Sequence, residues 1–276
     1  MATYRAQVLR SALACVAAAL IVSIVGAAGP ARAVDVVGDD GADRYTGSGG
    51  LILPASIAQD TRQSVAQCRE CRWRLVAPCI HRPDEGAQVA CMAMVSGCPA
   101  GETRLRAWLS RDGGSSWIDV GLVCLGADGP VTVQAVDVAL HDAFVRSLPA
   151  GSISVQPPTG VLPYLPVVLD SGQPASIGPS SHHILGRAVV LSPRPRWHWT
   201  FGDGAELDTA LPGSHYPDLQ VAHTYRRGGP MEISVTTTWT ADFLVDGLGP
   251  FAVSEPVHQR FTTIIEVGQA RATLVP

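Results

Sequence analysis

Six of the seven cysteines in this 276-residue chain fall within one short stretch, where they could form disulfides, bind zinc or act as nucleophiles. They are Cys68, Cys71, Cys79, Cys91, Cys98 and Cys124. Zinc sites repeat closely spaced cysteine pairs or add a histidine pair, but Cys68-x-x-Cys71 has no such counterpart downstream. An even number of grouped cysteines predicts three disulfides instead, provided that the chain is exported. Their connectivity stays open, and paired cysteines offer no thiol nucleophile.

Histidines and aspartates are the other candidate metal ligands. His182, His183, His215 and His223 would form a site only if the fold gathered them, because adjacent strand residues face opposite sides and no spacing enforces a cluster. Four acidic residues near the N-terminus lack the alternating ligand spacing of a calcium loop, so a solvated linker explains them better. These four are Asp35, Asp39, Asp40 and Asp43. We expect no cofactor, with calcium as the alternative.

Motifs of the common enzyme classes are missing from the sequence. There is no nucleophile elbow, no zinc-protease helix motif, no phosphate-binding P-loop and no dinucleotide fingerprint. The segment 110–117, Ser-Arg-Asp-Gly-Gly-Ser-Ser-Trp, matches the Asp-box hairpin of sialidase-type propellers. Those propellers carry several boxes that brace turns away from the active site, and this chain has one. We therefore expect a hairpin turn here and a protein that is not an enzyme.

The N-terminal 33 residues have the three-part layout of a secretory signal peptide. Arg5 and Arg10 precede an uncharged apolar stretch over 11–28, and Pro30 is followed by Ala-Arg-Ala at 31–33. This pattern predicts cleavage before Val34 and a secreted or cell-surface protein. The alternative is an uncleaved leader that anchors the protein in the membrane, since its apolar length is close to that needed to span a bilayer.

The charge of the chain restricts its partners. Without residues 1–33 the chain has 17 arginines against 24 acidic residues, a formal charge of −7, and it contains no lysine. An acidic surface argues against nucleic acid, whose phosphates demand a basic one. We expect an extracellular protein or a cell-wall glycan as partner, and membrane contact only through an uncleaved leader.

The mature chain divides into four predicted regions. Residues 34–67 are rich in glycine and aspartate and predict a flexible linker. Residues 68–126 alternate short apolar runs with turns, which predicts a small β module stabilised by its disulfides. In 127–160 the stripe Val133, Val136, Leu140 and Phe144 predicts one helix, followed by a proline-rich connector.

Residues 161–276 predict a mainly β domain. Apolar and polar residues alternate through 197–201, 231–240 and 257–267, with glycine and proline between these runs. Alternation of period two indicates strands with one buried and one solvated face. The expected fold class is thus mainly β, with a C-terminal antiparallel β-sandwich after a disulfide-rich β module and one connecting helix.

One motif of this region resembles a known family. The aromatic run Trp-His-Trp-Thr-Phe at 197–201 enters a Gly-Asp-Gly turn, and His-Thr-Tyr at 223–225 precedes a glycine pair and an alternating strand. This arrangement resembles the PKD (polycystic kidney disease) domain, over about residues 160–268. The resemblance implies an immunoglobulin-like sandwich with core or turn roles for Trp199, Phe201, Gly202, Asp203, Gly204, His223 and Tyr225.

Two departures from the PKD pattern bear on function. The segment 205–222 between the turn and His223 is long, and Gly229-Pro230-Met231 replaces the usual Gly-x-Tyr. The long segment is either a harmless insertion or a recognition loop held by a rigid frame. Exposed Trp, Tyr and Arg would be the contact residues, with Trp73 and Trp108 as candidates in the first module.

The resemblance implies a non-enzymatic binding or interaction protein that uses the PKD-like sandwich for protein or carbohydrate contacts. An extracytoplasmic polysaccharide hydrolase with the sandwich as an accessory domain is a second hypothesis, although 34–150 is small for a catalytic domain. A component of envelope or pilus assembly is a third.

Overall fold

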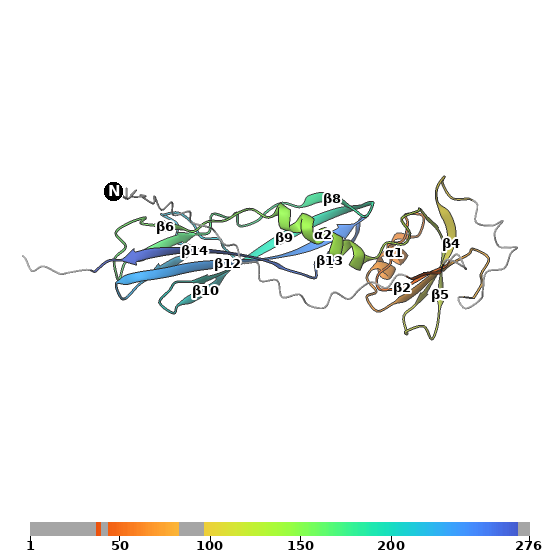
Figure 1. Ribbon diagram of the computed structural model, residues 1–276, viewed down its shortest axis with the longest axis horizontal. Coiled ribbons are helices and arrows are strands. Elements are labelled where there is room, and N and C mark those ends of the chain that lie inside the picture. Colours follow the sequence, from red (N-terminus) through yellow and green to blue (C-terminus); the bar gives the residue numbers. More distant parts are fainter. Residues whose placement is uncertain (1–36, 40–43, 83–96, 270–276) are drawn as a thin grey trace, which may run out of the picture. The chain divides into compact units, whose positions relative to one another are not determined.

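The computed structural model describes residues 37–39, 44–82 and 97–269. The predicted signal peptide and its cleavage site lie outside these residues. Antiparallel sheets dominate what is described, together with helices α1 (Gln59–Ala66) and α2 (Val133–Ser147) (Figure 1). The predicted mainly β fold class is confirmed.

The first sheet contains five antiparallel strands in sequence order: β1 (Val37–Asp39), β2 (Arg44–Ser48), β3 (Arg72–Val76), β4 (Thr103–Ser110) and β5 (Ile118–Leu125). Alternating residues of β3 and β4, among them Trp73, Leu75 and Leu105, are buried on one face. They pack with Leu51, Leu53 and Val65 into a single core. The alternation read from the sequence thus predicts β3, β4 and β5, whereas β1 and β2 lie before the predicted module 68–126.

The prediction of a flexible linker over 34–67 is wrong for the described residues of this stretch, which also include β1. This stretch contains β2 and α1, and Leu51, Ile52 and Leu53 are each no more than 2% exposed. Its glycines had suggested flexibility, but Gly47 serves close packing. A Cβ atom there would lie 2.2 Å from the Trp73 ring, which stacks over the bare backbone.

Disulfides crosslink the first module as predicted. Cys68 is bonded to Cys71, and Cys98, which precedes β4, is bonded to Cys124 in β5. Cys79 is disulfide-bonded as well, while Cys91 lies outside the described residues. Crosslinks of this kind persist in oxidising compartments, so they indicate an extracytoplasmic environment.

The C-terminal region is built on two long central strands, β9 (Arg187–Thr200) and β12 (Gly229–Val245), paired antiparallel over most of their length. On the outer side of β9 lie β8 (Ser180–Ile184) at one end and β10 (Glu206–Thr209) at the other. On the outer side of β12 lie β13 (Leu248–Ala252) and β14 (Val257–Val267). A second sheet has the order β11 (Ala222–Thr224), β7 (Pro166–Asp170) and β6 (Ser154–Gln156).

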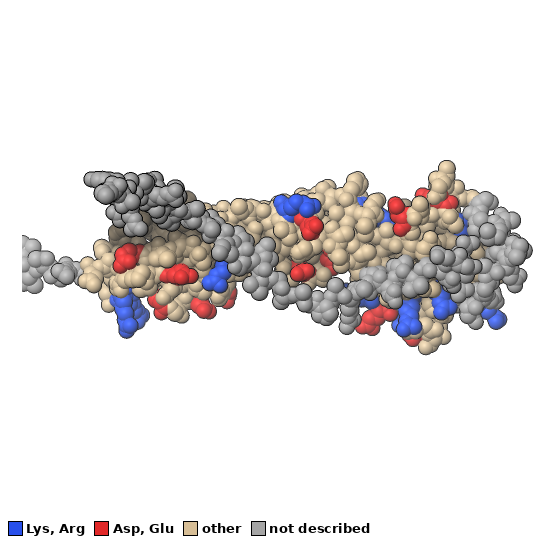
Figure 2. Space-filling model, in the orientation of Figure 1, with Lys and Arg blue, Asp and Glu red and all other residues tan. Residues whose placement is uncertain are grey.

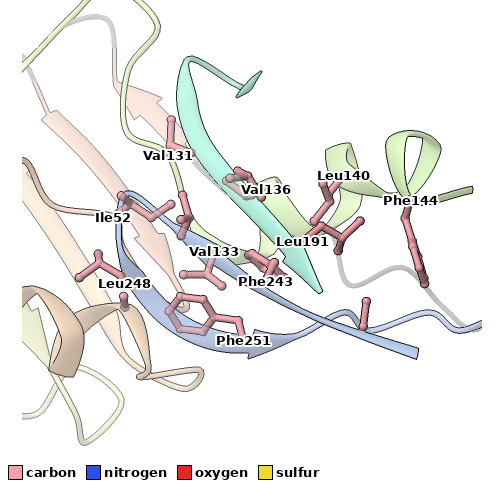
Figure 3. Close-up of a cluster of buried hydrophobic side chains, with 14 of the residues drawn as sticks. Ile52, Val131, Val133, Val136, Leu140, Phe144, Leu191, Phe243, Leu248 and Phe251 are labelled. Carbon is pink, nitrogen blue, oxygen red and sulfur yellow. The ribbon is translucent and has the colours of Figure 1, made fainter. Parts of the chain in front are cut away.

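Two different layers cover this long sheet. At the end that carries Trp197 and Trp199, the three-stranded sheet closes a β-sandwich around a core that includes Val167, Ile233 and Tyr225. The other half of β9 and β12 packs its apolar face against α2 and a few residues that follow β2. Figure 3 shows this second core, which contains Ile52, Val131, Val133, Val136, Leu140, Phe144, Leu191, Phe243, Leu248 and Phe251.

Helix α2 confirms the predicted stripe but has a larger role than a connector. Thr132 caps its N-terminus by accepting a hydrogen bond from the amide of Ala135 at 3.1 Å. Val136, Leu140 and Phe144 are fully buried against the sheet. The predicted connector over 127–160 is also too long, because β6 pairs with β7 inside the sandwich.

A buried polar group separates the two cores of the long sheet. Gln173, 4% exposed, accepts hydrogen bonds from Trp197 Nε1 at 3.2 Å and Thr237 Oγ1 at 2.6 Å. The Gln173 Nε2 donates to Gln259 Oε1 at 2.7 Å, and this Gln259 oxygen also accepts a hydrogen bond from Trp239 Nε1. One amide therefore satisfies polar groups on two strands of a sheet that would otherwise be buried without partners.

Pro193 and Pro195 lie inside β9, where a proline would normally break a ladder. β8 pairs with Arg187–Leu191 and β10 with Trp197–Thr200, so in the described chain the residues between them pair only with β12. Proline has no N–H to donate, and on this stretch no second strand requires one. The prolines also discourage another chain from adding to the open edge.

Candidate functional site

The Gly-Asp-Gly turn lies at the sandwich end of β9. Trp197, Trp199 and Phe201 point into the core, as their alternation predicts. The chain then turns at Gly202, whose φ of +82° favours glycine. A Cβ atom at Gly202 would also lie 2.7 Å from the backbone of Glu232 on the neighbouring strand. Both the backbone angle and the space therefore require glycine here.

Asp203 and His223 meet across this turn. His223 Nε2 lies 2.8 Å from Asp203 Oδ2, and the amide of Ala205 donates to Asp203 Oδ1 at 3.1 Å. Partial burial raises the pKa of Asp203, but the hydrogen bonds from His223 and Ala205 outweigh it and hold that pKa below its ordinary value. Asp203 thus closes the loop as an acceptor.

Aromatic contacts complete the cluster. The His223 ring stacks on Phe201 at 4.2 Å between centroids and meets Tyr225 edge-on at 4.6 Å. The Tyr225 hydroxyl donates to the carbonyl of Phe201 at 3.0 Å, and burial raises the pKa of this hydroxyl. The structure therefore brings Trp199, Phe201, Asp203, His223 and Tyr225 to one end of the sandwich.

A His–Asp pair could orient a general base, and such a base would act on a nucleophile beside it. Within 37–39, 44–82 and 97–269, no hydroxyl or thiol side chain is hydrogen-bonded to the His223 ring. Nucleophilic catalysis needs such a group within hydrogen-bond reach of the base. The cluster instead links the Gly-Asp-Gly turn to β11 through the Asp203–His223 contact and the Phe201–His223 ring stack. These contacts hold the turn in place.

The Asp-box segment is a braced hairpin turn between β4 and β5. Asp112 accepts from the Ser110 hydroxyl at 2.7 Å and from the Ser116 amide at 2.9 Å. Trp117 Nε1 donates to the carbonyl of Gly114 at 3.1 Å. Hydrogen bonds from Ser116 and Ser110 hold the pKa of Asp112 well below its ordinary value. Asp112 therefore stays ionised and keeps the turn in place.

The histidines do not converge. His182 contacts Ser180 on β8, His198 contacts Asp208 on β10, and His258 contacts Thr238 on β12. Among the residues with assigned positions, no three His, Cys, Asp or Glu side chains form a group that could hold a metal ion.

The long segment 205–222 is ordered. After β10, Ser214 donates its amide to the carbonyl of Leu169 at 3.1 Å, and the amide of Leu169 donates to the carbonyl of Val221 at 2.9 Å. Both ends of the loop 214–221 therefore lie against one residue of β7. Within the loop, the Ser214 hydroxyl donates a hydrogen bond to the carbonyl of Asp218 and accepts one from the amide of Gln220. Such a closed surface loop is an Ω-loop.

This Ω-loop folds over the outer side of the three-stranded sheet. The amide of Tyr216 donates to Gln156 Oε1 on β6 at 2.7 Å, which ties the loop across the sheet. Val168 alternates with the inward Val167 and Leu169 and so faces outward, yet it is only 4% exposed. The tip leaves two apolar side chains in solvent, Tyr216 at 75% and Leu219 at 54% exposure.

The two tryptophans predicted as contact residues of the first module, Trp73 and Trp108, differ in their exposure. Trp73 is 1% exposed and belongs to the core, so its proposed role as a contact residue is wrong. Trp108 is half-buried and packs on Val76, Ala77 and Ile80. Tyr216 was not singled out from the sequence, although its place in the long segment was the available signal.

Comparison with known protein families, with curated proteins and with solved structures finds no match to this chain. In the part of the chain with assigned structure, neither helix is long and apolar enough to cross a bilayer. Fold and site thus define a mainly β, disulfide-bonded protein with a braced turn cluster and an ordered surface loop.

Proposed function

We propose that this chain is a secreted or cell-surface binding protein without catalytic activity. Its PKD-like β-sandwich would contact an extracellular protein or a cell-wall glycan. The N-terminal leader pattern and the disulfides support export. The bracing role of the Asp203–His223 pair supports a structural rather than a catalytic use of the PKD-like motif.

The Ω-loop is the observation that carries this proposal. Tyr216 and Leu219 are apolar and exposed, yet the backbone that carries them is hydrogen-bonded to β6, to β7 and to itself. A loop that is ordered before binding loses little conformational entropy when a partner arrives. Tyrosine is also among the residues that contribute most to binding.

The test uses residues 34–276 produced under oxidising conditions. The protein is incubated with a cell-wall glycan fraction and, separately, with an envelope protein fraction, and the bound amount is titrated. We expect Tyr216→Ser with Leu219→Ser to weaken binding about tenfold or more, since an anchor side chain contributes roughly 2 kcal/mol. The matched control is Ile264→Thr on β14, which removes an apolar side chain of similar exposure from a strand outside the Ω-loop.

Two results would contradict the proposal. The first is equal binding by the loop variant and the Ile264→Thr control. The second is release of new reducing ends from the glycan fraction, because that would reveal hydrolysis.

A further inference from the structure

The turn between β6 and β7 places a tyrosine where the backbone favours glycine. Residues 162–165 form a β-turn in which the amide of Leu165 donates to the carbonyl of Leu162 at 3.4 Å. Pro163 takes the second position of this turn, and Tyr164 takes the third with a φ of +65°. This combination is typical of a type II turn, whose third position is usually glycine or asparagine because a larger side chain crowds the backbone there. The segment 162–165 is named the tyrosine turn below.

The Tyr164 side chain does not offset this unfavourable conformation. It is 72% exposed, and it forms no hydrogen bond or ring contact with the described part of the chain. The amide of Tyr164 donates to the carbonyl of Tyr225 at 2.8 Å, but glycine would form the same hydrogen bond. Residues held in sparsely populated backbone conformations concentrate at functional sites. The position therefore indicates a use for the tyrosine side chain outside the sandwich.

Two further apolar side chains lie beside Tyr164 in the tyrosine turn. Leu162 is 38% exposed and Leu165 is 56% exposed. Pro163 between them fixes its own φ and so restricts the backbone of the turn. The amide of Gly268, just after β14, donates to the carbonyl of Val161 at 2.8 Å, which places the turn at the end of the sandwich where β14 finishes. An ordered apolar projection thus marks this end.

Two arginines adjoin the tyrosine turn. Tyr225, whose carbonyl binds the turn, is followed directly by Arg226 and Arg227, and both arginines are exposed. Neither arginine side chain has an ion pair or hydrogen bond with any residue that the structure describes. The exposed Glu232 and Glu266 project from the outer face of the long sheet, since their neighbours point into the core. Figure 2 shows basic side chains at this end of the sandwich, with acidic ones nearby.

The geometry points to a membrane-contact site, in which the tyrosine turn enters the surface of a bilayer that contains anionic phospholipids. Leu162 and Leu165 leave water for the boundary of the acyl chains, and Tyr164 suits the interface because its ring is apolar and its hydroxyl is polar. The guanidinium groups of Arg226 and Arg227 bind the phosphate groups of the lipids. Apolar insertion and basic attraction together hold a protein at a membrane surface more firmly than either does alone.

Charge favours a lipid surface over an apolar groove on another protein. Such a groove would accept the turn but would leave Arg226 and Arg227 without partners, whereas anionic headgroups supply them. The chain is acidic as a whole, with a formal charge of −4, but salt screens interactions beyond about 8–10 Å. The arginines nearest the turn therefore decide the local attraction. This site is separate from the N-terminal leader and from the Ω-loop, so the inference does not rest on the proposed function.

The experiment measures cosedimentation of residues 34–276 with two kinds of vesicle, phosphatidylcholine alone and phosphatidylcholine mixed with phosphatidylglycerol. We expect the protein to bind the mixed vesicles at low salt, to bind them less as salt rises, and to bind phosphatidylcholine alone far more weakly. Arg226→Gln with Arg227→Gln should weaken binding to the mixed vesicles about thirtyfold, because each arginine near an anionic surface contributes about fivefold.

Tyr164→Gly separates membrane contact from folding. Glycine suits the left-handed backbone, so this variant should keep or raise the thermal midpoint, by up to about 3 °C, while vesicle binding falls about fivefold. The matched control is Leu185→Gly in the turn between β8 and β9, where Leu185 has a φ of +48° and is 49% exposed. Arg187 beside that turn is paired with Asp246, so no free arginine adjoins it, and Leu185→Gly should bind vesicles as the native protein does.

Several results would overturn the inference. They are an absence of binding to the mixed vesicles at low salt, equal binding to both kinds of vesicle, and unchanged binding in Tyr164→Gly or in the arginine pair variant. An equal loss of binding in Leu185→Gly would overturn it too, as would a lowered midpoint with normal binding in Tyr164→Gly. The vesicle assay contains neither a glycan nor a protein partner, so its failure would leave the proposal for the Ω-loop unaffected.

Discussion

The first module and the sandwich are stabilised in different ways. All six cysteines after residue 33 lie in the first module, and its core contains one fully buried tryptophan, Trp73. The C-terminal sheet has no cysteine but buries Trp197, Trp199 and Trp239. Crosslinks restrict the unfolded chain, whereas large aromatics remove apolar area from water. A small sheet with a thin core needs the former more.

The largest expected effect is on the sandwich core. Trp199→Ala should destabilise the sandwich by about 3–5 kcal/mol, because the fully buried indole leaves a large cavity. Hydrogen exchange resolved by segment should show faster exchange in β7, β9 and β12. Equal acceleration in β3 and β4 would contradict the separate origin of stability in the two regions.

The reciprocal change removes a crosslink from the first module. Cys98→Ala with Cys124→Ala should cost about 2–4 kcal/mol, and the loss should concentrate in β4 and β5. Removing Cys68 and Cys71 is the control, since a separation of 3 residues restricts the unfolded chain less than a separation of 26. A larger loss in the control, measured by urea unfolding, would refute this account.

A smaller effect is expected at the polar group between the two cores. Gln173→Leu leaves the Trp197 N–H and the Thr237 hydroxyl buried without an acceptor, which should cost about 2–3 kcal/mol. Thermal unfolding monitored by tryptophan fluorescence measures the loss. Gln220→Leu, on the exposed side of the Ω-loop, should leave the midpoint almost unchanged. Similar midpoints in both variants would show that the buried amide contributes little.

The smallest effect concerns pH at the Asp203 turn. Because the folded-state pKa of Asp203 lies below its ordinary value of 3.8, its contribution is fully present above that pH. The contribution is lost as the pH falls through the depressed folded-state pKa. Asp203→Asn should therefore lower stability near neutral pH, and the difference from the native protein should shrink in acid. Urea unfolding at several pH values measures this, and a difference that grows in acid would contradict it.

Local patterns were enough to predict the longer elements but not the short strands or α1. The stripe Val133, Val136, Leu140 and Phe144 marked α2, and alternation marked the faces of β9 and β12. The linker prediction failed because glycine has two uses, flexibility and close approach, and only the position of Trp73 over Gly47 distinguishes them. The prediction of Trp73 as a contact residue failed for a related reason. Whether its side chain is buried depends on the other elements that pack around it.

The Ω-loop and the contact of Arg74 with Trp117 show the same limit for surface features. The length of the segment 205–222 indicated a special loop, but its closure depends on Leu169 and Gln156, which are distant in sequence. Arg74 and Trp117 come together through the register of β3 and the turn at Asp112. No spacing along the chain encodes that meeting.

The amino-acid sequence alone determined the strand alternation, the helix stripe, the grouped cysteines and the sharp glycine turn, because each depends on neighbouring residues. Only the tertiary structure decided that one long sheet is covered by a second sheet at one end and by α2 at the other. It also decided which glycines, prolines and tryptophans pack and which are exposed. The physical reason is that burial and pairing are set by residues far apart in the chain, whereas backbone preference is set locally.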